Sequence, residues 1–253
     1  MSSGSAGLAA ALGALALVDG VAVTDDGAAR LGAEVSERLA RVEARIDAAG
    51  GRGRVTMVAV TKGFGPEVVA AAVAAGVTDL GENYAQELVA KATDPAFAGG
   101  GCRIRWHFLG PLQTNKLPRL APWVSRWHGI DRLVAGAALA RRVPGAEVFV
   151  EVNLSGQPAR PGCALADAEA LVVALADRGL RVVGLMTVAP AGEGAAARRA
   201  FRQLAAQGRR LGLAELSMGM SDDFEMAIEE GATTVRLGRA LFGPRPAAAG
   251  ARR

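Results

Sequence analysis

The sequence has few aromatic residues and no basic cluster set among them. Aromatics make up 4% of the 253 residues, with three Trp, one Tyr and seven Phe. The net charge is +4, and the arginines are scattered in pairs such as Arg141 and Arg142. A nucleic-acid-binding face gathers basic residues with aromatics between them. We therefore expect no nucleic-acid partner.

Cysteine and long apolar runs are also scarce. Cys102 and Cys163 stand far apart without a CxxC motif, so neither a metal site nor a disulfide framework is indicated. No apolar run reaches the roughly 18 uncharged residues of a membrane span. The first 25 or so residues lack the basic start of a signal peptide. These features predict a cytoplasmic protein with no membrane partner.

What the sequence does contain is enough for one core, with 51% hydrophobic and 21% charged residues. We expect a flexible extension over residues 1–30, one folded domain over 31–245 and a flexible tail over 246–253. At the start of the domain, Leu39, Val42 and Ile46 recur at helical spacing and predict an amphipathic helix over 33–48.

The domain then alternates apolar, β-branched runs with helical segments. The expected strands are 55–61, 77–80, 104–109, 123–130, 147–154, 182–186, 215–218 and 233–237. The expected helices are 66–75, 84–92, 116–121, 133–142, 165–178, 195–211 and 223–230.

Eight strand-then-helix units predict a closed (β/α)8 barrel of the TIM type, because closure gives every parallel strand two neighbours. The alternative is an open doubly wound sheet. The barrel is favoured because no GxGxxG follows the first strand and the helices are evenly spaced. Chemistry in such a barrel lies at the C-terminal ends of the strands.

Lys62 is the most informative residue at these strand ends, because it follows an apolar strand. One interpretation is a lysine that extends along apolar surface to solvent. The other is a desolvated amine, which is neutral near neutral pH and forms a Schiff base with an aldehyde. The remaining strand ends bear on the choice.

The loops after the last two strands are rich in small residues. Ser217 to Ser221 (SMGMS) and Gly238-Arg239 let backbone N–H groups approach an anion. An ordinary helix start, with Ser221 or Asp222 as N-cap, is an alternative use of the first loop.

Arg236 lies between Val235 and Leu237 on the last strand, so alternation turns its side chain toward the barrel interior. A Schiff-base lysine, an anion loop and an inward arginine together describe a pyridoxal phosphate site in which the arginine meets the pyridine nitrogen. An arginine does not readily give up a proton there, so the ring would be a weak electron sink.

Five motifs in order resemble the YggS/PROSC family of pyridoxal phosphate homeostasis proteins. They are VAVTKGFGPEVVAAAVAAGVTDLGENYAQELVAKA (58–92), WHFLGPLQTNK (106–116), VEVNLSGQPARPG (150–162), GLMTVAP (184–190) and LSMGMSDDFEMAIEEGATTVRLGRALFG (216–243). The resemblance implies a single fold type III barrel, similar to the N-terminal domain of alanine racemase, with pyridoxal 5'-phosphate bound covalently to Lys62. It also implies cofactor contacts from Asn83, His107, Ser217, Gly219, Arg236, Gly238 and Arg239. His107 has a core histidine as its alternative.

Two functions follow from the resemblance. In the first, a monomer holds pyridoxal phosphate and supplies it to apo-enzymes without turnover of its own. In the second, the chain is an amino-acid racemase. Racemisation needs an acid/base group on each side of the substrate, and Lys62 supplies one. Tyr84 is the single tyrosine, and the chain ends ten residues after Gly243, so no second domain that would supply another is expected. The carrier function is favoured.

Overall fold

The structure is a computed structural model that describes residues 25–98, 104–190 and 194–245. Its strands are β1 (Thr56–Val60), β2 (Asp79–Glu82), β3 (Arg105–Phe108), β4 (Val124–Ile130), β5 (Glu147–Glu151), β6 (Arg181–Met186), β7 (Glu215–Ser217) and β8 (Thr234–Leu237). They form a closed parallel barrel in sequence order, and β8 pairs with β1 through registers such as Val58 with Arg236. The expected (β/α)8 barrel is confirmed.

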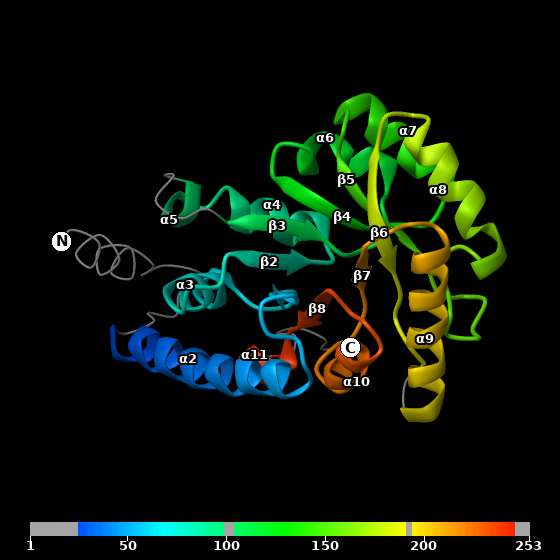
Figure 1. The fold of residues 1–253 in the computed structure, drawn as a ribbon. Helices are drawn as coiled ribbons and strands as arrows, with labels where there is room; N and C mark the ends of the chain where they lie inside the picture. The colour runs from blue at the N-terminus through cyan, green and yellow to red at the C-terminus, as the bar shows by residue number, and fades with distance from the viewer. Residues whose placement is uncertain (1–24, 99–103, 191–193, 246–253) are drawn as a thin grey trace, which may run out of the picture.

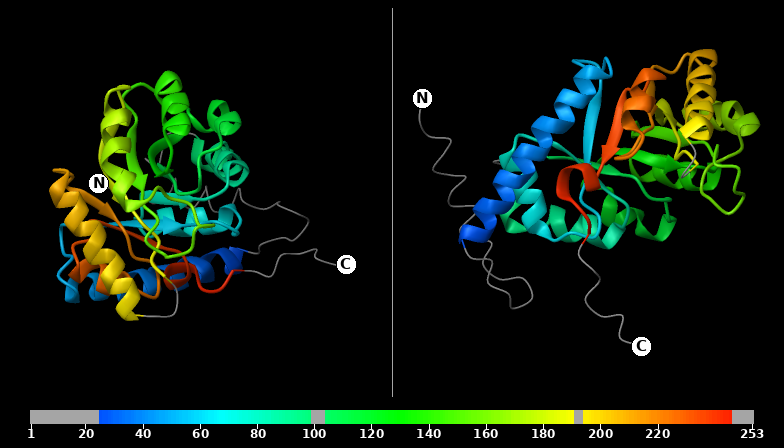
Figure 2. Two further views of the ribbon diagram at one scale, coloured as in Figure 1. Left: turned by 90° about the vertical axis from the view of Figure 1, so that its right-hand side faces the viewer. Right: turned by 90° about the horizontal axis from the view of Figure 1, so that it is seen from below.

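The helices lie outside the barrel (Figures 1 and 2). They are α2 (Asp25–Ala48), α3 (Pro66–Ala74), α4 (Ala85–Ala92), α5 (Pro95–Ala98), α6 (Leu117–Leu120), α7 (Leu133–Arg142), α8 (Ala168–Ala176), α9 (Gly194–Arg210), α10 (Phe224–Glu229) and α11 (Arg239–Phe242). Two 3-10 turns, η1 (Thr114–Lys116) and η2 (Leu165–Asp167), precede α6 and α8. No helix in the described part of the chain is long and apolar enough to cross a membrane.

Helix α2 seals one side of the barrel. Its buried residues Val35, Leu39, Val42 and Ile46 form one face, as their helical spacing predicts. The helix packs against α3, α10 and α11 (Figure 1). It therefore ties the first βα unit to the last two.

Several expected boundaries were wrong, among them those of α2, β2 and β5. Helix α2 begins at Asp25 and not at residue 33, so it overlaps the end of the expected extension. Strand β2 covers Asp79–Glu82 and not 77–80, and β5 ends at Glu151 and not at 154. Residues 1–24 and 246–253, where the flexible extension and tail were expected, lie outside the described residues, as does Cys102.

Candidate functional site

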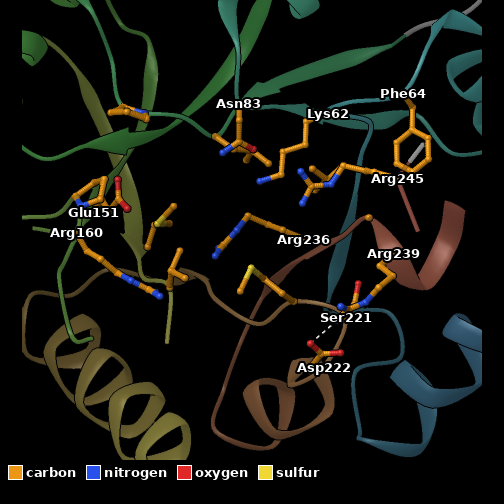
Figure 3. Close-up of a pocket in the computed structure, with 18 of the residues that line it drawn as sticks. Lys62, Phe64, Asn83, Glu151, Arg160, Ser221, Asp222, Arg236, Arg239 and Arg245 are labelled. Carbon is orange, nitrogen blue, oxygen red and sulfur yellow. Dashed lines mark hydrogen bonds and ion pairs between the residues drawn. The ribbon is translucent and has the colours of Figure 1, made fainter. Parts of the chain in front are cut away.

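A cavity of about 680 Å³ opens at the C-terminal ends of the strands, where a barrel of this type places its chemistry. Side chains from seven of the eight strand ends or the loops after them surround it (Figure 3). The polar and charged residues of the lining are Lys62, Asn83, Glu151, Asn153, Arg160, Ser221, Asp222, Arg236, Arg239 and Arg245. Cations outnumber carboxylates, so the cavity suits an anionic ligand.

Lys62 follows β1 directly and points into the cavity (Figure 3). Burial lowers the pKa of its amine, and the nearby Arg245 and Arg236 lower it further, while Glu82 and Glu87 act in the opposite sense. A larger fraction of the amine is therefore neutral at a given pH. This is the property that a nucleophilic lysine requires.

The backbone on both sides of Lys62 is held by a buried ion-pair cluster. The Lys91 amine donates to the Thr61 carbonyl at 2.7 Å and contacts the Glu82 carboxylate at 2.5 Å. The Thr61 hydroxyl also donates to Glu82, at 2.7 Å. On the other side, the Gly63 N–H donates to the Glu87 carboxylate at 2.7 Å. The strand end that carries Lys62 is thus anchored to β2 and α4.

Arg236 lies inside the barrel, 5% exposed, and lines the cavity. Its guanidinium donates to the Ser217 hydroxyl and carbonyl, both at 2.7 Å, and to the Thr187 carbonyl at 2.9 Å. Burial lowers its pKa to about 10, against the attraction of Glu151 and Asp223. The inward orientation expected from strand alternation is confirmed.

Gly238 lines the cavity. Arg239 also lines it, beside Ser221 and Asp222 (Figure 3). Arg239 forms an ion pair with Asp222. The Ser221 hydroxyl accepts from the Ala240 N–H at 3.1 Å, which joins the loops after β7 and β8. The N-cap position of α10 is occupied by Asp223, and not by Ser221 or Asp222.

Three of the expected site residues are not in the lining that the described residues form. Ser217 is fully buried beneath the cavity and contacts Arg236. Gly219 turns the loop with a φ of +94°, and its carbonyl accepts from the Arg236 N–H at 3.0 Å. His107 is 1% exposed and bonded to Asp79 and His128. The alternative of a core histidine thus describes His107 better.

The sequence analysis missed four polar or charged residues of the lining, Glu151, Asn153, Arg160 and Arg245, of which Glu151 is the most deeply buried. It ends β5, is 6% exposed and lines the cavity. Burial raises the pKa of its carboxyl to about 7, against the attraction of Arg236 and with the repulsion of Asp131. The sequence signal for Glu151 is a charged residue within an apolar run. Because the strand was expected to continue to residue 154, Glu151 was not recognised as a strand-end residue.

Comparisons with known proteins agree with this architecture. Residues 33–246 match the family described as the alanine racemase N-terminal domain. A pyridoxal phosphate homeostasis protein of Pseudomonas aeruginosa is 42% identical over 224 residues, which is 83% of this chain and 96% of that protein. Its counterpart in Escherichia coli K12 is 36% identical over 228 residues, 84% of this chain and 97% of that protein.

Solved structures include proteins with a similar fold. PipY of Synechococcus elongatus, described with bound PLP, has a TM-score of 0.72 at 29% identity and covers 83% of this chain and 100% of its own. Alanine racemase of Corynebacterium glutamicum, at 18% identity and a TM-score of 0.63, covers 88% of this chain and 62% of its own and shares the fold alone. The chain belongs to the family of pyridoxal phosphate homeostasis proteins, built on the alanine racemase N-terminal domain.

Proposed function

We propose that this chain binds pyridoxal 5'-phosphate in the cavity at the C-terminal end of the barrel, with Lys62 as the covalent attachment point, and supplies it to apo-enzymes. The observation that carries the proposal is Lys62 itself, an amine of lowered pKa in a cavity lined by four arginines. The family name of the relatives and the PLP-bound PipY structure support the same ligand.

The cavity's residues fit this cofactor. Pyridoxal phosphate carries an aldehyde, which condenses with a lysine amine to a Schiff base with loss of water. Its phosphate is an anion, and Arg239, Arg245 and Ser221 supply positive charge and a hydroxyl around the same space. Gly238 itself packs closely against β1, because a Cβ there would stand 3.1 Å from the Val60 carbonyl oxygen.

Each side chain has a distinct task in this proposal. Lys62 presents a neutral amine, and the ion-pair cluster of Lys91, Glu82 and Glu87 holds its backbone in place. Arg236 would supply a positive charge at the base of the cavity, and Asn83 lines the cavity close to the Lys62 strand end (Figure 3). Ser217 and Gly219 act indirectly, because both form hydrogen bonds with Arg236.

Tyr84 is a poor candidate for the second acid/base group of a racemase. It is 55% exposed and lies outside the cavity lining formed by the described residues. Glu151 is a better candidate than Tyr84 for this group in the racemase alternative, because it lines the cavity and its pKa of about 7 suits proton transfer. We retain the carrier, working as a monomer, as the proposed function.

The chain offers a direct test because it holds only three lysines, Lys62, Lys91 and Lys116. The protein is loaded with pyridoxal phosphate, reduced with borohydride to fix the Schiff base, digested and analysed by mass spectrometry. We expect the cofactor's mass on the Lys62 peptide, and its loss in Lys62→Ala. Lys116→Ala, a change on the η1 turn, is the matched control and retains the label. A label on Lys91 or Lys116 in the wild-type protein would overturn the assignment.

A further inference from the structure

Five side chains from five strands form a continuous line of hydrogen bonds through the barrel interior. Starting at the cavity, Arg236 Nη1 contacts Ser217 Oγ at 2.7 Å, and Ser217 Oγ contacts His128 Nδ1 at 2.9 Å. His128 Nε2 then contacts His107 Nδ1 at 2.9 Å, and His107 Nε2 contacts the Asp79 carboxylate at 2.9 Å. We call these five residues the interior chain.

Both ends of the interior chain have fixed roles as donor or acceptor. Arg236 can only donate, so Ser217 Oγ accepts from it. At the other end, hydrogen bonds from His107 and Arg105 hold the pKa of Asp79 below its ordinary value, although burial alone would raise it. Asp79 is therefore an ionised acceptor, and His107 carries a proton on Nε2.

As long as His107 is neutral, these two ends determine every proton between them. A neutral His107 with a proton on Nε2 accepts at Nδ1, so His128 donates from Nε2. His128 then accepts at Nδ1 from the Ser217 hydroxyl. All four bonds run in one direction, from the Arg236 guanidinium to the Asp79 carboxylate, and each imidazole is the neutral Nε2–H tautomer.

Protonation of His107 would reverse the middle of the interior chain. Its Nδ1 would donate to His128, and His128 would donate to Ser217, whose oxygen would face two donors. Ser217 is fully buried, and in the described part of the chain its hydroxyl contacts only Arg236 and His128, so its proton would then have no acceptor. His128 itself is neutral, because burial lowers its pKa well below its ordinary value and the positive charges of Arg236 and Arg126 lower it further.

We propose that His107 and His128 are positioning residues that orient Arg236 through Ser217, and that they do so as neutral Nε2–H tautomers. Without His128, the Ser217 hydroxyl is free to rotate and to offer its proton elsewhere, and Arg236 loses an oriented acceptor. The cavity's deepest positive charge is thus fixed by side chains that extend to the opposite side of the barrel interior. The expected effect on cofactor binding rests on the proposed function, whereas the expected histidine tautomers are independent of it.

The tautomers are measured on the unmodified protein by 15N NMR with labelled histidine. The chain has only two histidines, so two imidazoles are observed, and single His107→Gln and His128→Asn variants assign them. We expect both at neutral pH as Nε2–H tautomers. An imidazolium or an Nδ1–H tautomer at either residue would contradict the proposed direction.

The positioning role is measured by the affinity of folded variants for pyridoxal phosphate. His128→Leu removes the acceptor for Ser217, and we expect its dissociation constant to rise roughly threefold to tenfold, within the range for one hydrogen bond between neutral groups. His128→Asn, whose side-chain oxygen can stand near the lost Nδ1, should recover part of this loss. Unchanged affinity in His128→Leu would overturn the proposal, whatever its thermal stability.

Thr234→Val is the matched control. Thr234 is 1% exposed on β8, two residues before Arg236, and its hydroxyl has no partner among the described residues. Its replacement should leave the affinity unchanged. If the control weakens binding as much as His128→Leu does, the loss belongs to general core disruption and the positioning role is wrong. If the unmodified protein does not bind pyridoxal phosphate, the proposed function fails while the tautomer measurement still stands.

Discussion

Burial shifts the two oppositely charged residues beneath the cavity in opposite directions. It raises the pKa of Glu151 to about 7 and lowers that of Arg236 to about 10. Both shifts have one cause, because a low-dielectric interior disfavours the charged form of an acid and of a base alike. Mutual attraction reduces each shift without abolishing it. The pair therefore makes the stability of the barrel depend on pH.

We predict that Glu151→Gln stabilises the ligand-free protein at pH 8. Between the ordinary pKa of 4.5 and the folded value of about 7, the folded protein keeps a proton that the unfolded chain releases. Stability therefore falls as pH rises through this window and stays reduced above it. The full loss is at most about 3 kcal/mol.

Urea unfolding at pH 5 and pH 8 measures this difference. The gain of Glu151→Gln over the wild-type protein should be large at pH 8 and small at pH 5. Glu43→Gln is the control, because Glu43 is exposed on α2. Equal effects of the two variants at pH 8 would show that the Glu151 carboxyl is not buried as described.

At the residue scale, the sequence predicted those site residues that can be recognised from their immediate neighbours in the chain. Lys62 and Arg236 each interrupt an apolar run, and strand geometry alone gives their direction. Glu151 gave a similar signal, but its meaning depended on where β5 ends. Ser221 lines the cavity where Ser217 was expected. This difference depends on the shape of the loop after β7, which a periodic sequence pattern does not describe.

At the scale of elements, the sequence predicted all eight strands, because strands buried on both faces appear as continuous apolar runs. Strand β2 was misplaced because its last residue, Glu82, is charged, and Lys91, which forms an ion pair with it, lies nine positions later in the sequence. Strand β5 was drawn too long because Val152 and Leu154 continue the apolar pattern. Asn153 instead turns the chain, with its side-chain amide donating to the Gln157 and Arg160 carbonyls.

The loop between β7 and α10 provides a prediction about an element. Gly219 has a φ of +94°, and a Cβ there would stand 2.6 Å from the Ala227 Cβ and 3.0 Å from the Phe224 Cα. Gly219→Ala should therefore destabilise the protein by about 3 kcal/mol or more, through backbone strain and a clash against α10.

Gly212→Ala separates the two causes. Gly212 has a φ of +65° and nothing within 4 Å of an added Cβ, so its replacement by alanine should cost only about 1 kcal/mol of strain. Both values come from chemical denaturation. Gly219→Ala should also weaken cofactor binding, because the Gly219 carbonyl holds the Arg236 N–H. Equal costs for the two variants would contradict the packing described at Gly219.

At the scale of the whole molecule, barrel closure explains why residues far apart in sequence share one site. Lys62 on the first strand end and Arg236 on the last lie on neighbouring strands, because β8 pairs with β1. The sequence predicted this adjacency once closure was inferred. The interior chain was not predicted, because it requires the rotation of each side chain inside the barrel.

The last prediction distinguishes a carrier from a racemase. A racemase needs proton-transfer groups on both sides of its substrate, and in this cavity Lys62 and Glu151 are the candidates. The loaded protein is kept with L-alanine in deuterated water, and the rate of deuterium incorporation at the α-carbon is measured. If the protein is a carrier, this rate should be no higher than the rate with Glu151→Gln. A pyridoxal-phosphate-dependent apo-enzyme in the same tube should regain activity. Stereoinversion that disappears in Glu151→Gln but persists in Tyr84→Phe would overturn the carrier function. It would identify Glu151 as the second group, since Tyr84 is largely exposed to solvent.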